Sequence, residues 1–109
     1  MKVEKPWGHE IRWAVNDKYI GKKLYIKRGH RLSLQKHEVK DETIFVLKGL
    51  LILELEHKSI VLEPGDSYRI EPNTIHRFVA PKEGFVELIE VSTPEIDDVI
   101  RLDDDYGRA

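Results

Sequence analysis

The stretch GHRLSLQKHEVKDETIFVLKG, residues 29–49, carries the strongest indication of how this chain folds. Leu32–His37 and Ile44–Leu47 are predicted to be two short β-strands, because polar or glycine-containing turns bound each of them. Residues two positions apart on a strand point to the same face of the sheet. Gln35 and His37 are therefore expected to share a face and to converge on one point.

The rest of the chain repeats this pattern of short apolar segments separated by turns. Turn signals such as Glu63-Pro64-Gly65-Asp66 recur at a spacing of about ten residues, and no stretch before Pro94 is convincingly helical. This spacing predicts an all-β sandwich or barrel, and a closed or double-sheet barrel would also limit exposed edges. Further strands are expected at residues 11–15, 19–27, 51–55, 59–62, 67–70, 76–79 and 85–91.

The whole chain, residues 1–109, is interpreted as a single domain. In the first predicted strand, Ile11, Trp13 and Val15 alternate with charged or small residues, as in a half-buried strand. The segment after Pro94 is acidic, and residues 97–102 are expected to form a short helix or an edge strand. Five aromatic residues are expected in the core rather than at a sugar-binding surface: Trp7, Trp13, Phe45, Phe78 and Phe85.

The composition excludes several kinds of function. The formal charge is −2, with 18 basic and 20 acidic residues, so nothing indicates binding to nucleic acid. No apolar run is long enough to cross a membrane, and the N-terminus has no apolar signal core, which favours a cytoplasmic protein. There is no cysteine, so any metal must be held by histidine, carboxylate or amide ligands.

A mixed set of nitrogen and oxygen ligands is available. Gln35 and His37 share a strand, Glu42 follows after a polar bend, and His76 lies on a distant strand. Such a set suits one divalent ion of zinc, manganese, iron, cobalt or nickel, and the spacing does not choose among them. The alternative is that each histidine is simply packed or solvated, which is the ordinary state of a lone histidine at a strand end.

The glycine spacing around these residues resembles the first cupin motif. In that motif a glycine precedes His-x-His, a glutamate and a second glycine; here Gly29, His37, Glu42 and Gly49 fit, and Gln35 fills the first histidine position. Residues 65–76 resemble the second motif, with Glu71 and Asn73 in place of the usual proline and glycine. The resemblance implies a cupin double-stranded β-helix, also called a jelly-roll barrel.

Nearly the whole chain resembles one branch of the cupins, the type II phosphomannose isomerase family, in a stand-alone form without a guanylyltransferase domain. The matching segments are Pro6–Gly8, Leu32–His37, Asn73–Arg77, Ile89–Val91, Asp97–Arg101 and Asp105–Arg108. That family accounts for a glutamine at the first histidine position. Lys40 stands where the family usually has arginine, and Thr43-Ile44 replaces its usual His-Trp.

The resemblance implies metal-dependent conversion of mannose 6-phosphate to fructose 6-phosphate. Glu90 and Lys22 are the candidates for moving protons, because each shares its strand phase with apolar residues expected to face the barrel interior. The alternative for both is a side chain that reaches solvent. For the phosphate, the family pattern points to Arg77 and Arg101, and Lys40 could replace the family's arginine near the metal.

Two other functions fit the same residues. One is a non-catalytic metal-containing cupin that binds a sugar or nucleotide sugar in polysaccharide precursor metabolism. The other is an oxygenase, since His37, His76 and Glu42 alone make a two-histidine, one-carboxylate iron site. Because cupins commonly dimerise through outer strands, the resemblance also implies a homodimer. The expected ligand is a small sugar phosphate, with neither nucleic acid nor membrane as a partner.

Overall fold

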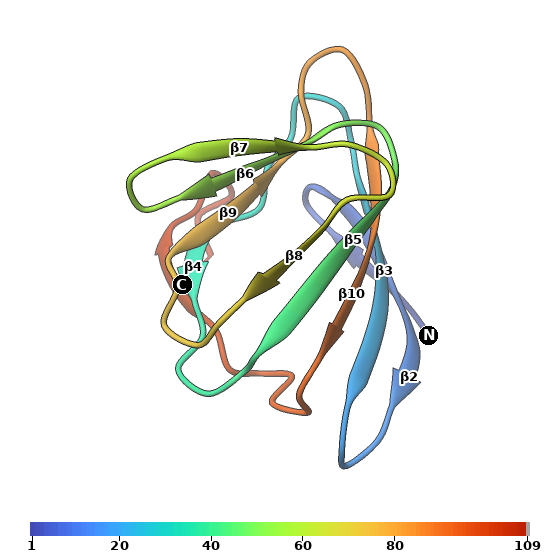
Figure 1. Cartoon of the computed structure of the whole chain (residues 1–109), viewed down its shortest axis with the longest axis vertical. Coiled ribbons are helices and arrows are strands. Elements are labelled where there is room, and N and C mark those ends of the chain that lie inside the picture. Colours follow the sequence, from blue (N-terminus) through green and yellow to red (C-terminus); the bar gives the residue numbers. More distant parts are fainter. Residues whose placement is uncertain (109) are drawn as a thin grey trace.

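The computed structural model describes residues 1–108 and contains two antiparallel β-sheets that enclose one core (Figure 1). The six-stranded sheet has the order β1-β2-β3-β10-β5-β8, and the five-stranded sheet has the order β11-β4-β9-β6-β7. Within the described residues there is no helix, so none that could cross a membrane. The all-β barrel prediction is confirmed. The strands are β1 (Lys2–Lys5), β2 (Gly8–Val15), β3 (Ile20–Ile26), β4 (Leu34–Lys36), β5 (Glu42–Lys48), β6 (Leu51–Leu55), β7 (Ser59–Leu62), β8 (Ser67–Ile70), β9 (His76–Val79), β10 (Val86–Ser92) and β11 (Ile100–Asp103).

Strand β10 lies between β3 and β5 and shows how the barrel separates its core from its site. Its inward residues alternate with outward ones, and the register sets Leu88 beside Leu24 of β3 and Val46 of β5. All three are buried and belong to the apolar core. One repeat further along, the inward position of β10 is Glu90, which is paired with Lys22. The same rows of side chains therefore form an apolar core and then a polar cavity.

The N-terminal strands differ from the prediction. An additional strand, β1, pairs with β2, and β2 starts earlier than expected. The phase of β2 is also reversed: Glu10 is buried, whereas Trp13 and Val15 are 55% and 59% exposed. The physical reason is that Glu10 finds buried cationic partners inside the barrel, and the ring of Trp13 covers Gly21 on the outer face.

The prediction of five core aromatics is confirmed for two and wrong for three. Trp7 and Phe78 are buried in the core. Trp13, Phe45 and Phe85 are exposed, because strand alternation places Phe45 on the outer face of β5 and the other two also lie outside the barrel. Large aromatic side chains do not by themselves indicate which face of a strand is inside.

The acidic C-terminal segment forms an edge strand, which was one of the two predicted possibilities. Strand β11 pairs with β4, and Arg101 lies opposite Gln35 in that register. The residues after β11 are held to the barrel by an ion pair from Arg31 to Asp105, with Nε–Oδ2 at 2.7 Å. The segment after β11 is thereby held close to β4, which carries the predicted metal ligand Gln35 and directly precedes His37.

Two loop residues need an unusual backbone conformation. Gly49 has a φ of 78°, and a Cβ atom there would lie 2.2 Å from the carbonyl oxygen of Phe85, so only glycine fits. Asn73 has a φ of 67°, a region that asparagine tolerates better than most residues, and its N–H donates to the carbonyl of His37. This explains how asparagine can stand where the second motif usually has glycine.

Candidate metal centre and active-site cavity

Three buried side chains from different strands meet inside the barrel. His37 follows β4, Glu42 begins β5 and His76 begins β9. The Nε2 atoms of His37 and His76 lie 3.1 and 3.2 Å from Glu42 Oε1. One possible ligand atom from each residue lies within 4.8 Å of the others, so this triad could hold a metal ion. All three belong to the predicted ligand set.

The protonation of the two histidines is consistent with metal ligation. His37 Nδ1 contacts the carbonyl oxygen of Asp98, and His76 Nδ1 lies 2.8 Å from the carbonyl oxygen of Thr74. A carbonyl oxygen only accepts, so both Nδ1 atoms donate, and in the neutral rings the lone pairs lie on Nε2. These lone pairs face the Glu42 carboxylate. Such an arrangement of acceptors is repulsive unless a cation or extra protons lie between them.

The triad also contains buried polar atoms without hydrogen bonds. Glu42 Oε2 and His76 Nε2 are fully buried and have no hydrogen-bond partner within the described residues. Leaving such atoms unsatisfied is costly, and their coordination of a divalent cation would remove the penalty. The residues present therefore fit the metal that the ligand pattern implies. Two imidazoles and a carboxylate suit zinc, manganese, iron, cobalt or nickel.

Gln35 lies next to this triad in the sheet. It is the register partner of His76 and lines the same cavity as His37. The hydroxyl of Ser33 donates to Gln35 Oε1 at 3.2 Å, which fixes the side-chain amide and leaves a second lone pair on that oxygen. Gln35 can thus supply an oxygen as a fourth ligand, as the sequence predicts.

A second carboxyl group lies close to Glu42. Burial disfavours ionisation of Glu42, but its contacts with His37 and His76 and the charge of Lys40 outweigh burial and hold its pKa well below the usual range. Burial, followed by repulsion from Glu42, raises the pKa of Glu90 to about 8. Lys40 Nζ lies 3.7 Å from Glu42 and 3.8 Å from Glu90. The two carboxyl groups therefore differ strongly in their tendency to hold a proton.

The predicted residue Lys22 lies on the other side of Glu90, where it belongs to a charge cluster that the sequence did not reveal. Its Nζ is 3.2 Å from Glu10 Oε2, and the Nε of Arg12 lies 2.9 Å from the same oxygen. Glu10 and Arg12 were missed because the apolar residues of β2 were expected to face inward. Two charged residues at alternate positions of β2 were the available signal.

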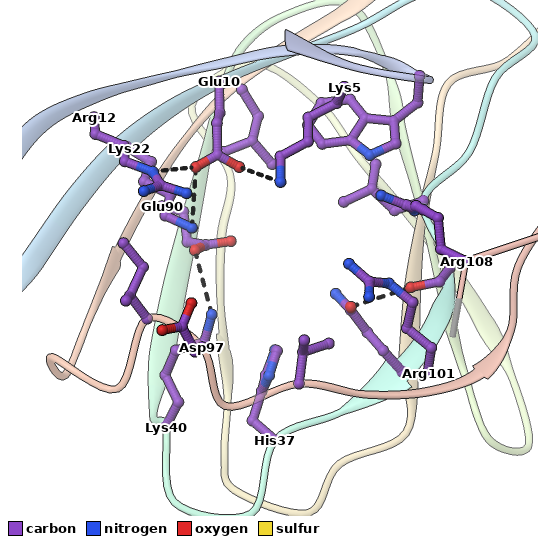
Figure 2. Close-up of a pocket in the computed structure, with 17 residues that line it drawn as sticks. Lys5, Glu10, Arg12, Lys22, His37, Lys40, Glu90, Asp97, Arg101 and Arg108 are labelled. Carbon is purple, nitrogen blue, oxygen red and sulfur yellow. Dashed lines mark hydrogen bonds and ion pairs between the residues drawn. The ribbon is translucent and has the colours of Figure 1, made fainter. Parts of the chain in front are cut away.

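These groups surround a cavity of about 270 Å³ (Figure 2). That volume lies just below the range of roughly 300–1000 Å³ typical of ligand pockets and suits a small ligand. In Figure 2, Glu90 and Lys40 lie on one side and Arg101 and Arg108 on the other, with His37 between them. Apolar side chains, including Trp7, line part of the wall.

The cavity brings together most of the predicted site residues. Glu90, Lys22, Lys40, Arg101, Gln35 and His37 line it. Arg77 is not among the lining residues: its Nη2 donates to the carbonyl oxygen of Asp103 at 2.9 Å and to its carboxylate at 3.1 Å. This arrangement favours a role for Arg77 in holding β11 rather than in contacting a ligand.

Asp98 connects the C-terminal segment to the metal centre. Its carboxylate accepts hydrogen bonds from the backbone N–H groups of Glu38, Val39 and Lys40, at 3.1, 2.7 and 2.8 Å. Its carbonyl oxygen meanwhile accepts from His37 Nδ1. Asp98 thus organises the bend between two candidate metal ligands, His37 and Glu42.

Replacing Asp98 with alanine should lower the stability of the domain by about 1–2 kcal/mol at neutral pH, because three backbone donors lose their acceptor. Those hydrogen bonds hold the pKa of Asp98 below its usual value. The stabilisation by the Asp98 carboxylate is therefore complete above the pKa that Asp98 has in the unfolded protein. It is lost as pH falls through the lower pKa that Asp98 has in the folded protein. Thermal unfolding at pH 7 and pH 3 checks this, with the exposed Glu83→Ala as control. An equal difference in Tm at both pH values would contradict it.

Comparison with known proteins identifies the relatives of this chain. Residues 1–104 match the family described as Mannose-6-phosphate isomerase C-terminal. The chain is 32% identical over 110 residues to the alginate biosynthesis protein AlgA of Pseudomonas aeruginosa. This match covers 98% of the chain but only 23% of AlgA, so the chain spans about a quarter of the length of that relative.

Solved structures share the fold at low sequence identity. KdgF from a Halomonas species has a TM-score of 0.80 and 24% identity, with 90% of this chain and 91% of that one covered. A cupin-superfamily protein from Silicibacter pomeroyi, described as a sugar phosphate isomerase, has a TM-score of 0.71 and 21% identity, with 78% and 58% covered. The fold is therefore the predicted cupin double-stranded β-helix, and the chain belongs to the mannose-6-phosphate isomerase C-terminal family.

Proposed function

We propose that this protein is a metal-dependent aldose–ketose isomerase acting on a sugar phosphate, with mannose 6-phosphate and fructose 6-phosphate as the most suitable pair. The observation that carries the proposal is the position of Glu90. Its buried carboxyl group lines the same cavity as His37 and lies 3.8 Å from Lys40, which in turn lies 3.7 Å from Glu42. Membership of the family and the name of the Silicibacter pomeroyi neighbour support the same reaction class.

The reaction moves one proton between two adjacent carbons. Glu90 takes the proton from C2 of the open-chain aldose onto a carboxylate oxygen and returns it to C1, while the hydroxyl proton passes from O2 to O1. A carboxyl group whose pKa lies near the working pH can both accept and return a proton. A divalent cation held by Glu42, His37 and His76 would polarise the two oxygens on these carbons.

The neighbouring side chains control this proton transfer. Lys40 stabilises the ionised form of Glu90 and can donate to a hydroxyl group of the sugar. Lys22, which pairs with Glu90 in the register and is ion-paired to Glu10, is our candidate for carrying the hydroxyl proton between the two oxygens. The apolar wall at Trp7 and Leu32 excludes water from the reacting carbons.

The test starts from purified protein that is stripped of metal and reloaded with zinc, manganese, cobalt or iron. Mannose 6-phosphate is then added, and its conversion to fructose 6-phosphate is followed by NMR. We expect turnover with at least one metal and none after stripping. Tight binding of sugar phosphate without turnover under any metal would instead support the non-catalytic binding protein. Oxygen consumption by the iron-loaded sample would support the oxygenase.

We also propose that the protein forms a homodimer through the outer face of the six-stranded sheet. Large apolar side chains are exposed at outward positions of three of its strands: Trp13, Val15, Phe45 and Val91. Such a surface is unusual for a monomer, and a second copy of the chain would bury it.

Light scattering should therefore give about twice the chain mass of 12.8 kDa. Phe45→Lys should shift the protein to a monomer, because it places charge in the buried contact. Val61→Lys is the matched control: Val61 is also exposed, at 59%, but lies on β7 in the other sheet. A wild-type protein that remains monomeric at tens of micromolar would rule the dimer out.

A further inference from the structure

The loop between two candidate metal ligands, residues 38–41, takes its hydrogen bonds from a distant part of the chain. All four of its backbone N–H groups donate to side chains of one other segment. Three of them donate to the Asp98 carboxylate at 3.1, 2.7 and 2.8 Å, and the fourth, that of Asp41, donates to Thr93 Oγ1 at 3.0 Å. The carbonyl oxygen of Asp41 accepts in return from the N–H of Thr93, also at 3.0 Å.

The outer half of this loop has little else to fix its shape. Glu38 and Val39 are exposed, so they bury no apolar surface that would hold the backbone in place. The inner half is anchored by side chains, because Lys40 is buried and the Asp41 carboxylate is ion-paired to Arg69. The path of the backbone between the two ligands therefore depends on the acceptors that the other segment supplies.

That segment is the β10–β11 connection, residues 93–99, which depends on the same hydrogen bonds. Its own backbone bonds close only short turns, from the N–H of Ile96 to the carbonyl of Pro94 and from Val99 to Asp97. Within the part of the chain that the structure describes, none of its residues belongs to the apolar core. Segments with so few buried apolar contacts open locally at low cost. In Figure 1 the connection runs along the lower end of the barrel, beside the loop that joins β4 and β5.

The β10–β11 connection contacts both the metal centre and the cavity. The carbonyl oxygen of Asp98 accepts from His37 Nδ1, which holds that ring in the tautomer whose Nε2 can bind a cation. The residues on either side, Ile96, Asp97 and Val99, line the cavity. Figure 2 shows Asp97 at the cavity wall. One short segment thus orients a candidate ligand and forms part of the wall that a bound ligand would meet.

We propose that Asp98 and Thr93 are positioning residues that couple metal binding to the docking of the β10–β11 connection. The docked connection holds the loop that carries His37 and Glu42 at its two ends, so docking raises metal affinity. Because linkage is reciprocal, metal binding stabilises docking by the same factor. The cation therefore orders the cavity wall as well as the ligands. The inference rests on the metal centre of the proposed function but not on the isomerisation.

The first test measures the Kd for zinc, or for whichever predicted ion binds wild type most tightly, by competition with a colorimetric chelator. Asp98→Ala should raise it by about 10–100-fold, the usual effect of removing a residue that orients a ligand. Asp98→Asn keeps one acceptor oxygen and should have a smaller effect. Thr93→Val removes a single acceptor and should raise the Kd less than Asp98→Ala. Thr93→Ser keeps the hydroxyl group and should bind like wild type.

The second test uses wild-type protein and follows hydrogen exchange of its backbone amides by NMR, with and without metal. Metal should slow exchange at residues 38–41 and at Thr93 by at least about tenfold, within the usual range of coupling between sites. The amide of Glu63, which donates to Asp66 in a separate turn, should exchange at the same rate in both states. This measurement remains decisive if Asp98→Ala proves too unstable to study.

Two control variants separate coupling from a general loss of stability. Glu95→Gln changes a charge in the same connection at a residue that does not line the cavity. Asp66→Ala removes a carboxylate that accepts from the backbone N–H of Glu63 at 2.8 Å, in a turn outside the metal centre. Both should bind metal like wild type, even if Asp66→Ala lowers Tm as much as Asp98→Ala does.

The outcomes separate this coupling from the proposed function. If wild type binds metal and Asp98→Ala binds it equally tightly, or if metal leaves exchange at residues 38–41 unchanged, the coupling is wrong and the proposed function stands. If both effects are seen but no metal supports conversion of mannose 6-phosphate, the coupling stands and the isomerase proposal fails. A wild type that binds none of zinc, manganese, iron, cobalt or nickel would overturn both.

Discussion

Glu90→Gln is expected to lower kcat for mannose 6-phosphate by about 10²–10⁴-fold, the usual contribution of a positioned general base or acid. Glutamine has nearly the same shape as glutamate and cannot accept a proton from carbon. Glu90 is not part of the metal triad of His37, Glu42 and His76, so the variant should bind metal and keep its KM within a few fold. When the reaction is run in D₂O, the rate at which deuterium enters the product at C1 should fall by the same factor as kcat.

Strand β10 provides a control for this substitution. Glu87 is on the same strand, points outward and pairs with Lys23 at 3.2 Å, so Glu87→Gln should leave kcat unchanged. If Glu90→Gln retained more than a tenth of the wild-type kcat while the metal was fully bound, the proton-transfer role would have to be given to another residue, with Lys22 the next candidate.

His37→Ala is expected to raise the Kd for the metal by more than about 100-fold. Removing a residue that only orients a ligand usually raises it by roughly 10–100-fold, and His37 is a candidate ligand itself. The substitution removes one of two imidazoles and leaves Glu42 and His76 as an incomplete set. Because metal stabilises only the folded protein, adding zinc should raise the Tm of wild type and leave the variant unchanged. This readout does not depend on catalysis.

His57→Ala is the control, because His57 is a histidine that does not belong to the candidate metal site. The His57 side chain is 88% exposed, and its removal should change neither metal content nor Tm. The site assignment would be contradicted if His37→Ala showed a zinc-dependent rise in Tm equal to that of wild type. Measuring metal content after dialysis against a chelator distinguishes a weakened site from an unfolded protein.

Much of the barrel could be predicted because strand alternation and turn residues are local signals. The strands from β3 to β10 lie close to their predicted positions, since Gly49 and the Pro64-Gly65 turn mark where the chain must reverse. The facing of β2 was predicted wrongly. Apolar residues were expected inside, but the buried cluster around Glu10 outweighs that tendency, and no local pattern reports a charged partner on a neighbouring strand such as Lys22.

The candidate site shows the same limit. His37, Glu42 and His76 could be anticipated because their spacing from the flanking glycines is a local feature, and the structure brings them within 4.8 Å of one another. The place of Lys5 and Arg108 in the lining of the cavity could not, because they come from opposite ends of the chain. Asp98 was likewise invisible, since its role depends on three backbone donors about sixty residues away.

The most direct test of the central claim is a titration of metal-free protein with a divalent cation while turnover of mannose 6-phosphate is recorded. Turnover should rise in proportion to bound metal and stop rising at one equivalent per chain, and His37→Ala should show no such rise. Turnover that is independent of added metal, or its absence at full occupancy with every metal of the predicted set, would contradict a metal-dependent isomerase.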